Sequence, residues 1–133
     1  MYAEGTSKYR GDDPVRRIGA SNRQFLESYQ KHAAMMTIIE QAAALYPEFR
    51  SLRRQLRRSF VDRIGSNLQR LADAGHIDRS LDPGVAAHAL VSMTDNFGYL
   101  WFVLGETFDS EQAYVTLTRL WSNSLGLTAP GGR

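Results

Sequence analysis

Three prolines constrain the fold of this chain more than any other feature. Pro14 and Pro83 each follow an aspartate, and Pro47 follows Tyr46. An Asp–Pro pair is typical of a helix start, because the aspartate caps the first amides and proline fits the first helical position. A residue before proline is pushed out of the α region, so Tyr46 also separates two helices. The sequence therefore predicts helices that begin at Pro14, Pro47 and Pro83.

Apolar residues recur between these starts at steps of three and four, which is the spacing of one buried helical face. No alternating run is long enough for a β-strand. A further helix is predicted after Asp109, and helix ends are expected at Gly75, Gly105 and Gly126. The chain is therefore predicted to be an all-α helical bundle of four to five helices. Three of these helices have a clear buried face. The residues of these faces are Val15, Ile18, Asn22, Phe25, Leu26 and Tyr29 in the first, Phe49, Leu52, Leu56, Phe60, Ile64, Leu68 and Leu71 in the helix after Pro47, and Ala113, Leu117, Leu120, Trp121 and Leu125 in the last.

One stretch lacks a polar face. Residues 32–46 read HAAMMTIIEQAAALY, with Glu40 as the one acidic residue and no arginine or lysine. A helix that is apolar nearly all round must be buried, so we expect this helix to be central. The sequence leaves open whether a break near His32 separates it from the preceding helix.

The composition fixes the class of protein. With 133 residues, of which 43% are hydrophobic and 23% charged, the chain has the size and balance of one globular domain. We expect that domain to span residues 14–127, with a frayed tail at 1–13 and a flexible tail at 128–133. The absence of cysteine excludes disulfides and thiolate-bound metals, and it favours a cytoplasmic location.

Catalytic and membrane functions have little support. The three histidines, His32, His76 and His88, are scattered, and neither a nucleophile elbow nor a phosphate-binding glycine loop is present. The longest apolar run, residues 97–104, is less than half of the ~20 residues that a membrane-spanning helix needs. We therefore expect a protein that is not an enzyme, needs no cofactor or metal, and does not contact a membrane.

Four segments together resemble the C-terminal effector-binding domain of TetR-family transcriptional regulators, from Asp13 to Leu127. They are DPVRRIGASNRQFLESYQKHAAMMTIIEQAA, LQRLADAGHID, LDPGVAAHALVSM and YVTLTRLWSNSLGL. The resemblance implies a domain that binds a small, often apolar effector and forms a homodimer through its last two long helices. In that family a separate N-terminal helix-turn-helix module reads DNA.

That DNA-reading module has no counterpart in the sequence. A three-helix reader needs on the order of 50 residues, whereas only the segment before Pro14 precedes the predicted domain. We therefore expect contact with DNA only through a module absent from this chain.

An arginine cluster offers a competing interpretation. Helical geometry places Arg50, Arg53, Arg54, Arg57 and Arg58 on one face of the helix after Pro47. Such a face can grip phosphates, but no aromatic residues alternate with the arginines for base stacking. The sequence favours a solvated face of an amphipathic helix.

A second face combines polar and aromatic residues. His88, Ser92, Asp95, Tyr99 and Phe102 follow at steps of four, three, four and three on the helix after Pro83. They either line a ligand cavity or form a structural hydrogen-bond network that joins His88 to Asp95. With the family resemblance, we expect a mostly apolar effector to contact a cavity whose candidate residues are Tyr29, Met36, Ile39, Phe60, Ile64, His88, Asp95, Tyr99 and Phe102.

The last two helices carry few charges. Between Glu111 and Leu125 only Glu111 and Arg119 are charged, and residues 97–104 have no charge at all. A surface helix normally carries more, so pairing with a second copy would bury this apolar area. The alternative is that both helices face their own core. The candidate residues of the dimer seam are Phe97, Trp101, Leu117, Leu120 and Trp121.

Two functions from different classes follow. The leading one is a small-molecule-sensing and dimerisation domain of a TetR-like regulator that lacks the helix-turn-helix reader. The alternative is a ligand-free all-α module for protein–protein interaction. A closed cavity of ligand size between the helices before and after Pro47 would favour the first.

Overall fold

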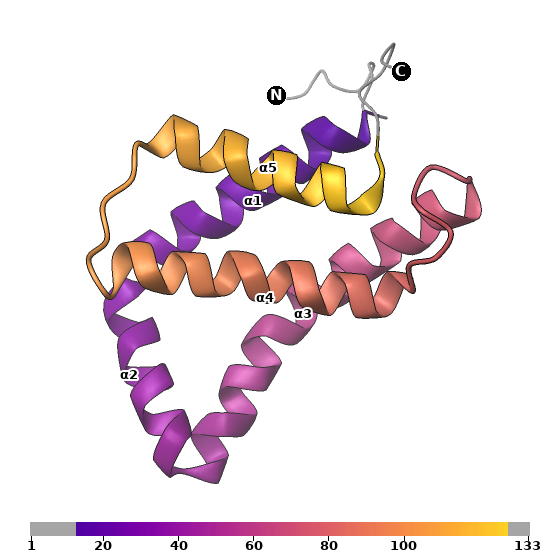
Figure 1. Ribbon diagram of the computed structural model, residues 1–133. Helices are drawn as coiled ribbons and strands as arrows, with labels where there is room; N and C mark the ends of the chain where they lie inside the picture. The colour runs from indigo at the N-terminus through magenta and orange to yellow at the C-terminus, as the bar shows by residue number, and fades with distance from the viewer. Residues whose placement is uncertain (1–12, 128–133) are drawn as a thin grey trace.

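The computed structural model describes residues 13–127, and within that range the chain is entirely helical between its turns. Figure 1 shows the arrangement, and no strand occurs in the described part. The prediction of an all-α bundle of four to five helices is confirmed. The five helices are α1 (Pro14–Lys31), α2 (Ala33–Leu45), α3 (Pro47–Asp73), α4 (Pro83–Phe102) and α5 (Ser110–Leu125). Almost all of the two expected tails lies outside the described residues.

The helix starts are those that the sequence predicts. The carboxylates of Asp13, Asp82 and Asp109 each accept a hydrogen bond from an amide two or three residues ahead, at 3.1, 2.8 and 2.9 Å. Tyr46 is extended, with ψ 124°, so α2 ends directly before α3 begins. Each start is thus fixed by local chemistry and does not depend on the tertiary fold.

A break at His32 separates α1 from α2. Its backbone has φ −112° and ψ 25°, which is outside the helical region, and its ring Nδ1 lies 3.0 Å from the Ser28 carbonyl oxygen. At the other ends, Gly126 closes α5 in the left-handed conformation with φ 77°. Helix α4 ends at Phe102, three residues before the predicted Gly105.

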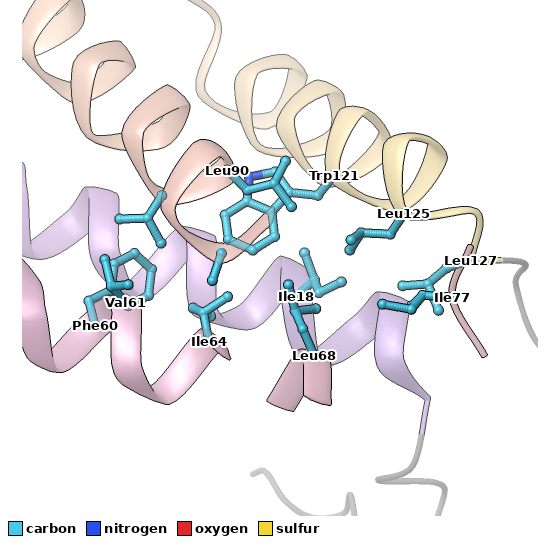
Figure 2. Close-up of a cluster of buried hydrophobic side chains, with 12 residues drawn as sticks. Ile18, Phe60, Val61, Ile64, Leu68, Ile77, Leu90, Trp121, Leu125 and Leu127 are labelled. Atoms are coloured by element: carbon cyan, nitrogen blue, oxygen red, sulfur yellow. The ribbon is translucent and has the colours of Figure 1, made fainter. Parts of the chain in front are cut away.

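The main core lies where α1, the second half of α3, α4 and α5 meet. Figure 2 shows the indole of Trp121 among aliphatic side chains from all four helices. Such interiors are closely packed, so their side chains fix how the helices cross. The buried residues of this core cluster include Ile18, Phe60, Val61, Ile64, Leu68, Ile77, Leu90, Val91, Trp121, Leu125 and Leu127.

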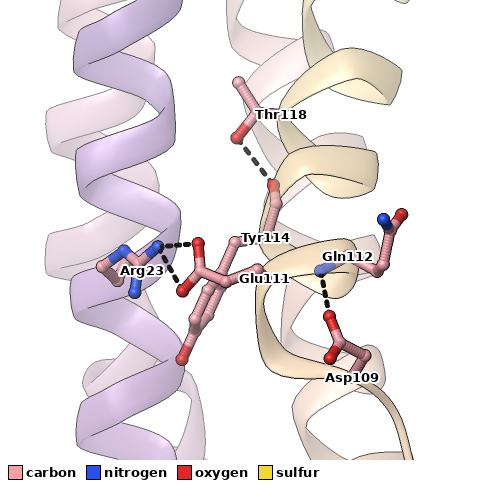
Figure 3. A network of polar contacts seen from close by, with 6 residues as sticks. All are labelled: Arg23, Asp109, Glu111, Gln112, Tyr114 and Thr118. Carbon is pink, nitrogen blue, oxygen red and sulfur yellow. Dashed lines mark hydrogen bonds and ion pairs between the residues drawn. The ribbon is translucent and has the colours of Figure 1, made fainter.

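Arg23 ties α1 to α5 outside that core. As Figure 3 shows, its guanidinium donates to both carboxylate oxygens of Glu111, at 2.9 and 3.1 Å, and lies 4.2 Å from the centre of the Tyr114 ring. Both charged side chains are largely exposed, so the ion pair contributes little stability. The two helices approach closely, since a Cβ at Gly19 would lie 3.3 Å from the Thr118 hydroxyl oxygen.

The prediction that residues 32–46 form a central helix is wrong. Helix α2 lies at the edge of the bundle (Figure 1) and packs mainly against α3. Ile39 and Ala43 are buried, but Met35, Ile38 and Leu45 are 48, 61 and 74% exposed. No other helix of residues 13–127 covers this outer face, which the apolar composition alone could not foresee.

The buried face predicted for α3 holds only for its second half. Phe60, Ile64 and Leu68 are buried, whereas Leu52 and Leu56 are 38 and 47% exposed. Figure 1 shows why: α4 crosses α3 near its middle, and the first half of α3 runs on beside α2.

Two helical glycines differ in the space around them, which gives a matched test of packing. A Cβ at Gly98 of α4 would lie 3.0 Å from Cδ2 of Tyr29, whereas one at Gly65 of α3 would meet Ala87 at an ordinary 3.8 Å. Alanine gains about 1 kcal/mol over glycine inside a helix. We expect Gly65→Ala to raise the free energy of unfolding by about that amount, and Gly98→Ala to lower it by about 1 kcal/mol through overpacking. Urea denaturation measures both, and equal stabilisation by the two changes would contradict this account.

Candidate functional site

A group of charged side chains lies between helices, where the sequence predicts a cavity wall. Arg53 of α3 donates from Nε to Glu40 of α2 at 2.7 Å and from its guanidinium to Asp95 of α4 at 3.1 Å. One turn further along α3, the Arg57 guanidinium donates to the Ser92 hydroxyl at 2.8 Å. We call Tyr29, Glu40, Arg53, Arg57 and Asp95 the polar cluster.

The spacing of these residues explains how they meet. Arg53 and Arg57 lie one turn apart on α3, and Ser92 and Asp95 lie about one turn apart on α4. Because α3 and α4 are in extensive contact, two pairs form across the same helix interface. The prediction that the whole arginine face is solvated is therefore wrong for Arg53 and Arg57.

Burial and the Arg53 guanidinium act on Asp95 in opposite directions. Its side chain is 11% exposed, and desolvation raises the pKa of its carboxyl group, although the Arg53 guanidinium acts in the opposite direction. The hydrogen bond to Glu40 in turn raises the pKa of Arg53. A carboxylate held at this depth depends on its arginine partner.

Tyr29 brings α1 into the polar cluster. Its side chain is 4% exposed, and its hydroxyl has no hydrogen-bond partner among residues 13–127. Burial is the main reason that its pKa is raised, and the nearby carboxylates of Asp95 and Glu40 add to the effect. The hydroxyl therefore stays protonated and remains an unused donor.

The nine predicted ligand-binding residues divide into four groups. Tyr29 and Asp95 belong to the polar cluster, while Phe60 and Ile64 belong to the main core. His88 is exposed, and the hydrogen bond that Asp95 receives comes from Arg53 and not from His88. Of the remaining four, Ile39 is buried, and Met36, Tyr99 and Phe102 are partly buried.

Sequence reasoning did not single out Glu40, and it weighed Arg53 and Arg57 only as part of a face that could grip phosphates. One signal in the sequence could have identified Glu40, which is the one acidic residue of an apolar helix. A buried carboxylate without a partner costs free energy, so a basic partner was to be expected. Arg53, which meets Glu40, and Arg57, which meets Ser92, stand among three exposed arginines, namely Arg50, Arg54 and Arg58. Spacing alone does not separate them.

The most enclosed hollow described lies away from the polar cluster. It has a volume of about 80 Å³ between α1, α3 and α5, and Ile18, Ile64, Leu68 and Trp121 border it. Of the predicted ligand residues, Ile64 reaches this hollow, whereas Met36, Ile39 and Tyr99 do not. Sites for drug-sized ligands are typically about 300–1,000 Å³, so this hollow is too small for one.

Two larger depressions are open to solvent. One, of about 450 Å³, runs between α1 and α5 past Gly19, Ala20, Arg23 and Val115. The other, of about 400 Å³, lies at the α1–α2 joint and borders Phe102. Their shallow form suits contact with another surface better than enclosure of a small molecule.

The five seam candidates occupy different environments. Trp121 has 0% and Leu117 3% of its surface exposed, so both belong to the core of the single chain. Leu120 is 48% exposed on α5. Phe97 and Trp101 are partly buried in an aromatic cluster, with ring centroids 4.6 and 5.6 Å from that of Phe108.

Residues 13–127 contain neither a candidate membrane span nor a candidate metal site. No helix within residues 13–127 is both long and apolar enough to cross a bilayer. In the same range, no three histidine, aspartate or glutamate side chains are grouped so that they could hold a metal ion.

The comparison with known proteins agrees with the fold. Residues 11–118 match the family described as "Tetracyclin repressor-like, C-terminal domain". No curated protein and no solved structure gives a significant match. The matched segment covers α1 to α4 and the first half of α5, including every residue of the polar cluster. The chain therefore belongs to the family of TetR-like C-terminal domains, the regulatory domains of TetR-type repressors.

Proposed function

We propose that this domain senses a small molecule where α1, α2, α3 and α4 meet, and that it forms a homodimer through the outer faces of α4 and α5. The observation that carries the sensing role is the buried Tyr29 hydroxyl, which lies without a partner beside the polar cluster. Buried polar groups are rarely left unpaired, so this hydroxyl is a natural hydrogen-bond donor for a bound molecule. The effector is small and mostly apolar, and contact with DNA requires a helix-turn-helix module outside the described residues.

The position of α2 explains how ligand binding could change the proposed dimer face. Helix α2 joins α1 at His32 and joins α3 at Tyr46, and it contacts the rest of the bundle mainly through α3. A ligand that binds one position of α2 and α3 better than another shifts the population towards it. Because α3 packs on α4, the shift reaches the proposed dimer face.

Native mass spectrometry of the purified chain tests the sensing role. A co-purified molecule that leaves on mild denaturation, or a member of an apolar compound collection that raises the unfolding temperature, supports it. The alternative is a ligand-free interaction module, for which the exposed apolar side chains of α2 provide a surface. A chain of 15.0 kDa that carries no ligand and responds to none of the compounds would favour that alternative.

Dimerisation is tested at Leu120. This side chain is 48% exposed on α5, so an arginine there leaves the core intact but puts a charge in the proposed interface. We expect light scattering to give twice 15.0 kDa for the parent and a single 15.0 kDa chain for Leu120→Arg. The matched control is Leu45→Arg on α2, which is 74% exposed and should leave the dimer intact. A parent of 15.0 kDa at micromolar concentration would contradict the proposal.

A further inference from the structure

Two buried donors in the polar cluster have no acceptor among residues 13–127. One is the hydroxyl of Tyr29 and the other is Nε of Arg57, whose terminal nitrogen is already used by Ser92. Tyr29 belongs to α1 and Arg57 to α3. A buried donor without a partner costs free energy that an incoming acceptor would recover.

The aromatic side chains around Tyr29 provide an apolar wall. Its ring lies 6.1 Å from that of Phe25 and 6.4 Å from that of Phe102, measured between centroids. On its third side the ring rests on Gly98, where even a methyl group would be crowded. A molecule that reaches the hydroxyl therefore meets aromatic surface beside it.

The charges of the cluster already balance, which limits the chemistry of that molecule. Arg53 and Arg57 carry two positive charges against the two negative charges of Glu40 and Asp95. An anion added here would be a buried charge without a counterion, which is costly. A neutral acceptor would satisfy the donors without that penalty.

We propose that the ligand carries a neutral carbonyl group on an apolar body, and that the carbonyl oxygen accepts a hydrogen bond from the Tyr29 hydroxyl. This inference rests on the proposed small-molecule sensing. It narrows the ligand class to ketones, esters, lactones and amides, and it excludes carboxylates and pure hydrocarbons as preferred ligands.

The first test needs no ligand. Tyr29→Phe removes a hydroxyl that makes no hydrogen bond in the described structure, so the midpoint of thermal unfolding should stay the same or rise. The control is Tyr46→Phe, which deletes a hydroxyl from a side chain that is 52% exposed and should change nothing. A clear fall in the midpoint for Tyr29→Phe alone would show that the hydroxyl has a structural partner, and it would overturn the inference.

The second test compares three probes of similar size with the full chain. They are 2-acetylnaphthalene, which is a ketone, 2-ethylnaphthalene, a hydrocarbon, and 2-naphthoate, a carboxylate. Isothermal titration should show the ketone binding about fivefold more tightly than the hydrocarbon, as one good hydrogen bond allows. In Tyr29→Phe this preference should disappear, while the affinity for the hydrocarbon stays unchanged. Tyr46→Phe should keep the preference.

The outcomes separate this inference from the proposed function. Tightest binding of 2-naphthoate, or a ketone preference that survives in Tyr29→Phe, overturns the carbonyl assignment but leaves small-molecule sensing intact. Equal affinity for the ketone and the hydrocarbon would likewise overturn the carbonyl assignment and leave small-molecule sensing intact. If none of the three binds up to its solubility limit, the carbonyl assignment fails as well, and native mass spectrometry then decides whether sensing fails with it.

Discussion

Replacing Trp121 with alanine is expected to lower the free energy of unfolding by about 3–5 kcal/mol. The indole has 0% of its surface exposed and lies at the centre of the core in Figure 2, between α1, α3 and α4. Its removal leaves a cavity that the surrounding helices cannot fill without shifting. It also removes the hydrogen bond from indole Nε1 to the Thr94 hydroxyl, which measures 2.9 Å.

Because a domain of this size has about 5–15 kcal/mol of stability, the alanine variant can lie close to unfolding. Trp121→Phe is the milder change, since it keeps an aromatic ring and loses the hydrogen bond, at a cost of about 1–2 kcal/mol. Urea denaturation followed by circular dichroism measures both variants. Leu45→Ala, at a 74% exposed position, serves as the control and should change stability by less than about 0.5 kcal/mol. An alanine variant as stable as the parent would mean that Trp121 is not part of a packed core.

Replacing Arg53 with alanine is expected to destabilise the domain by about 2 kcal/mol at neutral pH. Loss of one partner from a fully buried pair costs about 3–5 kcal/mol, and we reduce that figure because the Arg53 side chain is 28% exposed. Asp95 and Glu40 would both lose their cation. The double variant Arg53→Ala/Asp95→Asn should recover about half of the loss, because it removes the uncompensated charge.

The pH dependence of the Arg53 variant provides an independent check. Burial already raises the pKa of Asp95 above its ordinary value of 3.8, and without Arg53 the pKa rises further. The folded state then binds a proton that the unfolded state has released, so stability falls as pH rises from 3.8 through the folded pKa. The deficit relative to the parent should therefore be largest near neutral pH and shrink towards pH 4. A deficit that is the same at all pH values, with no recovery in the double variant, would contradict the role given to Asp95.

The helices themselves were predictable because their signals are local. An aspartate before a proline caps a helix whatever lies around it, and the starts of α1 and α4 follow that rule. The stripe of α1 was also correct, since Ile18, Leu26 and Tyr29 are all buried. In these cases the residues within one segment are enough to predict its helix start or its buried face.

The predictions that were wrong concern burial and contacts that depend on a second segment of the chain. Spacing places Arg50 and Arg53 on one face of a helix, but only the paths of α2 and α4 decide which of them meets a carboxylate. Likewise, an apolar stripe on α5 shows that Trp121 is covered, but it does not show whether the cover is the chain's own core or another copy. Contacts between segments far apart in sequence are not encoded in either segment alone.

The two joints of α2 have a consequence for the energetics of the bundle. At His32 and at Tyr46 a single non-helical residue interrupts the chain, and the helix between them buries only Ile39 and Ala43. Opening this one helix exposes little apolar surface and leaves the core around Trp121 untouched. Its free energy of opening must therefore lie far below that of global unfolding. We therefore expect two cooperative units, one made of α1, α4, α5 and the second half of α3, and the other made of α2, whose amides should exchange with solvent first.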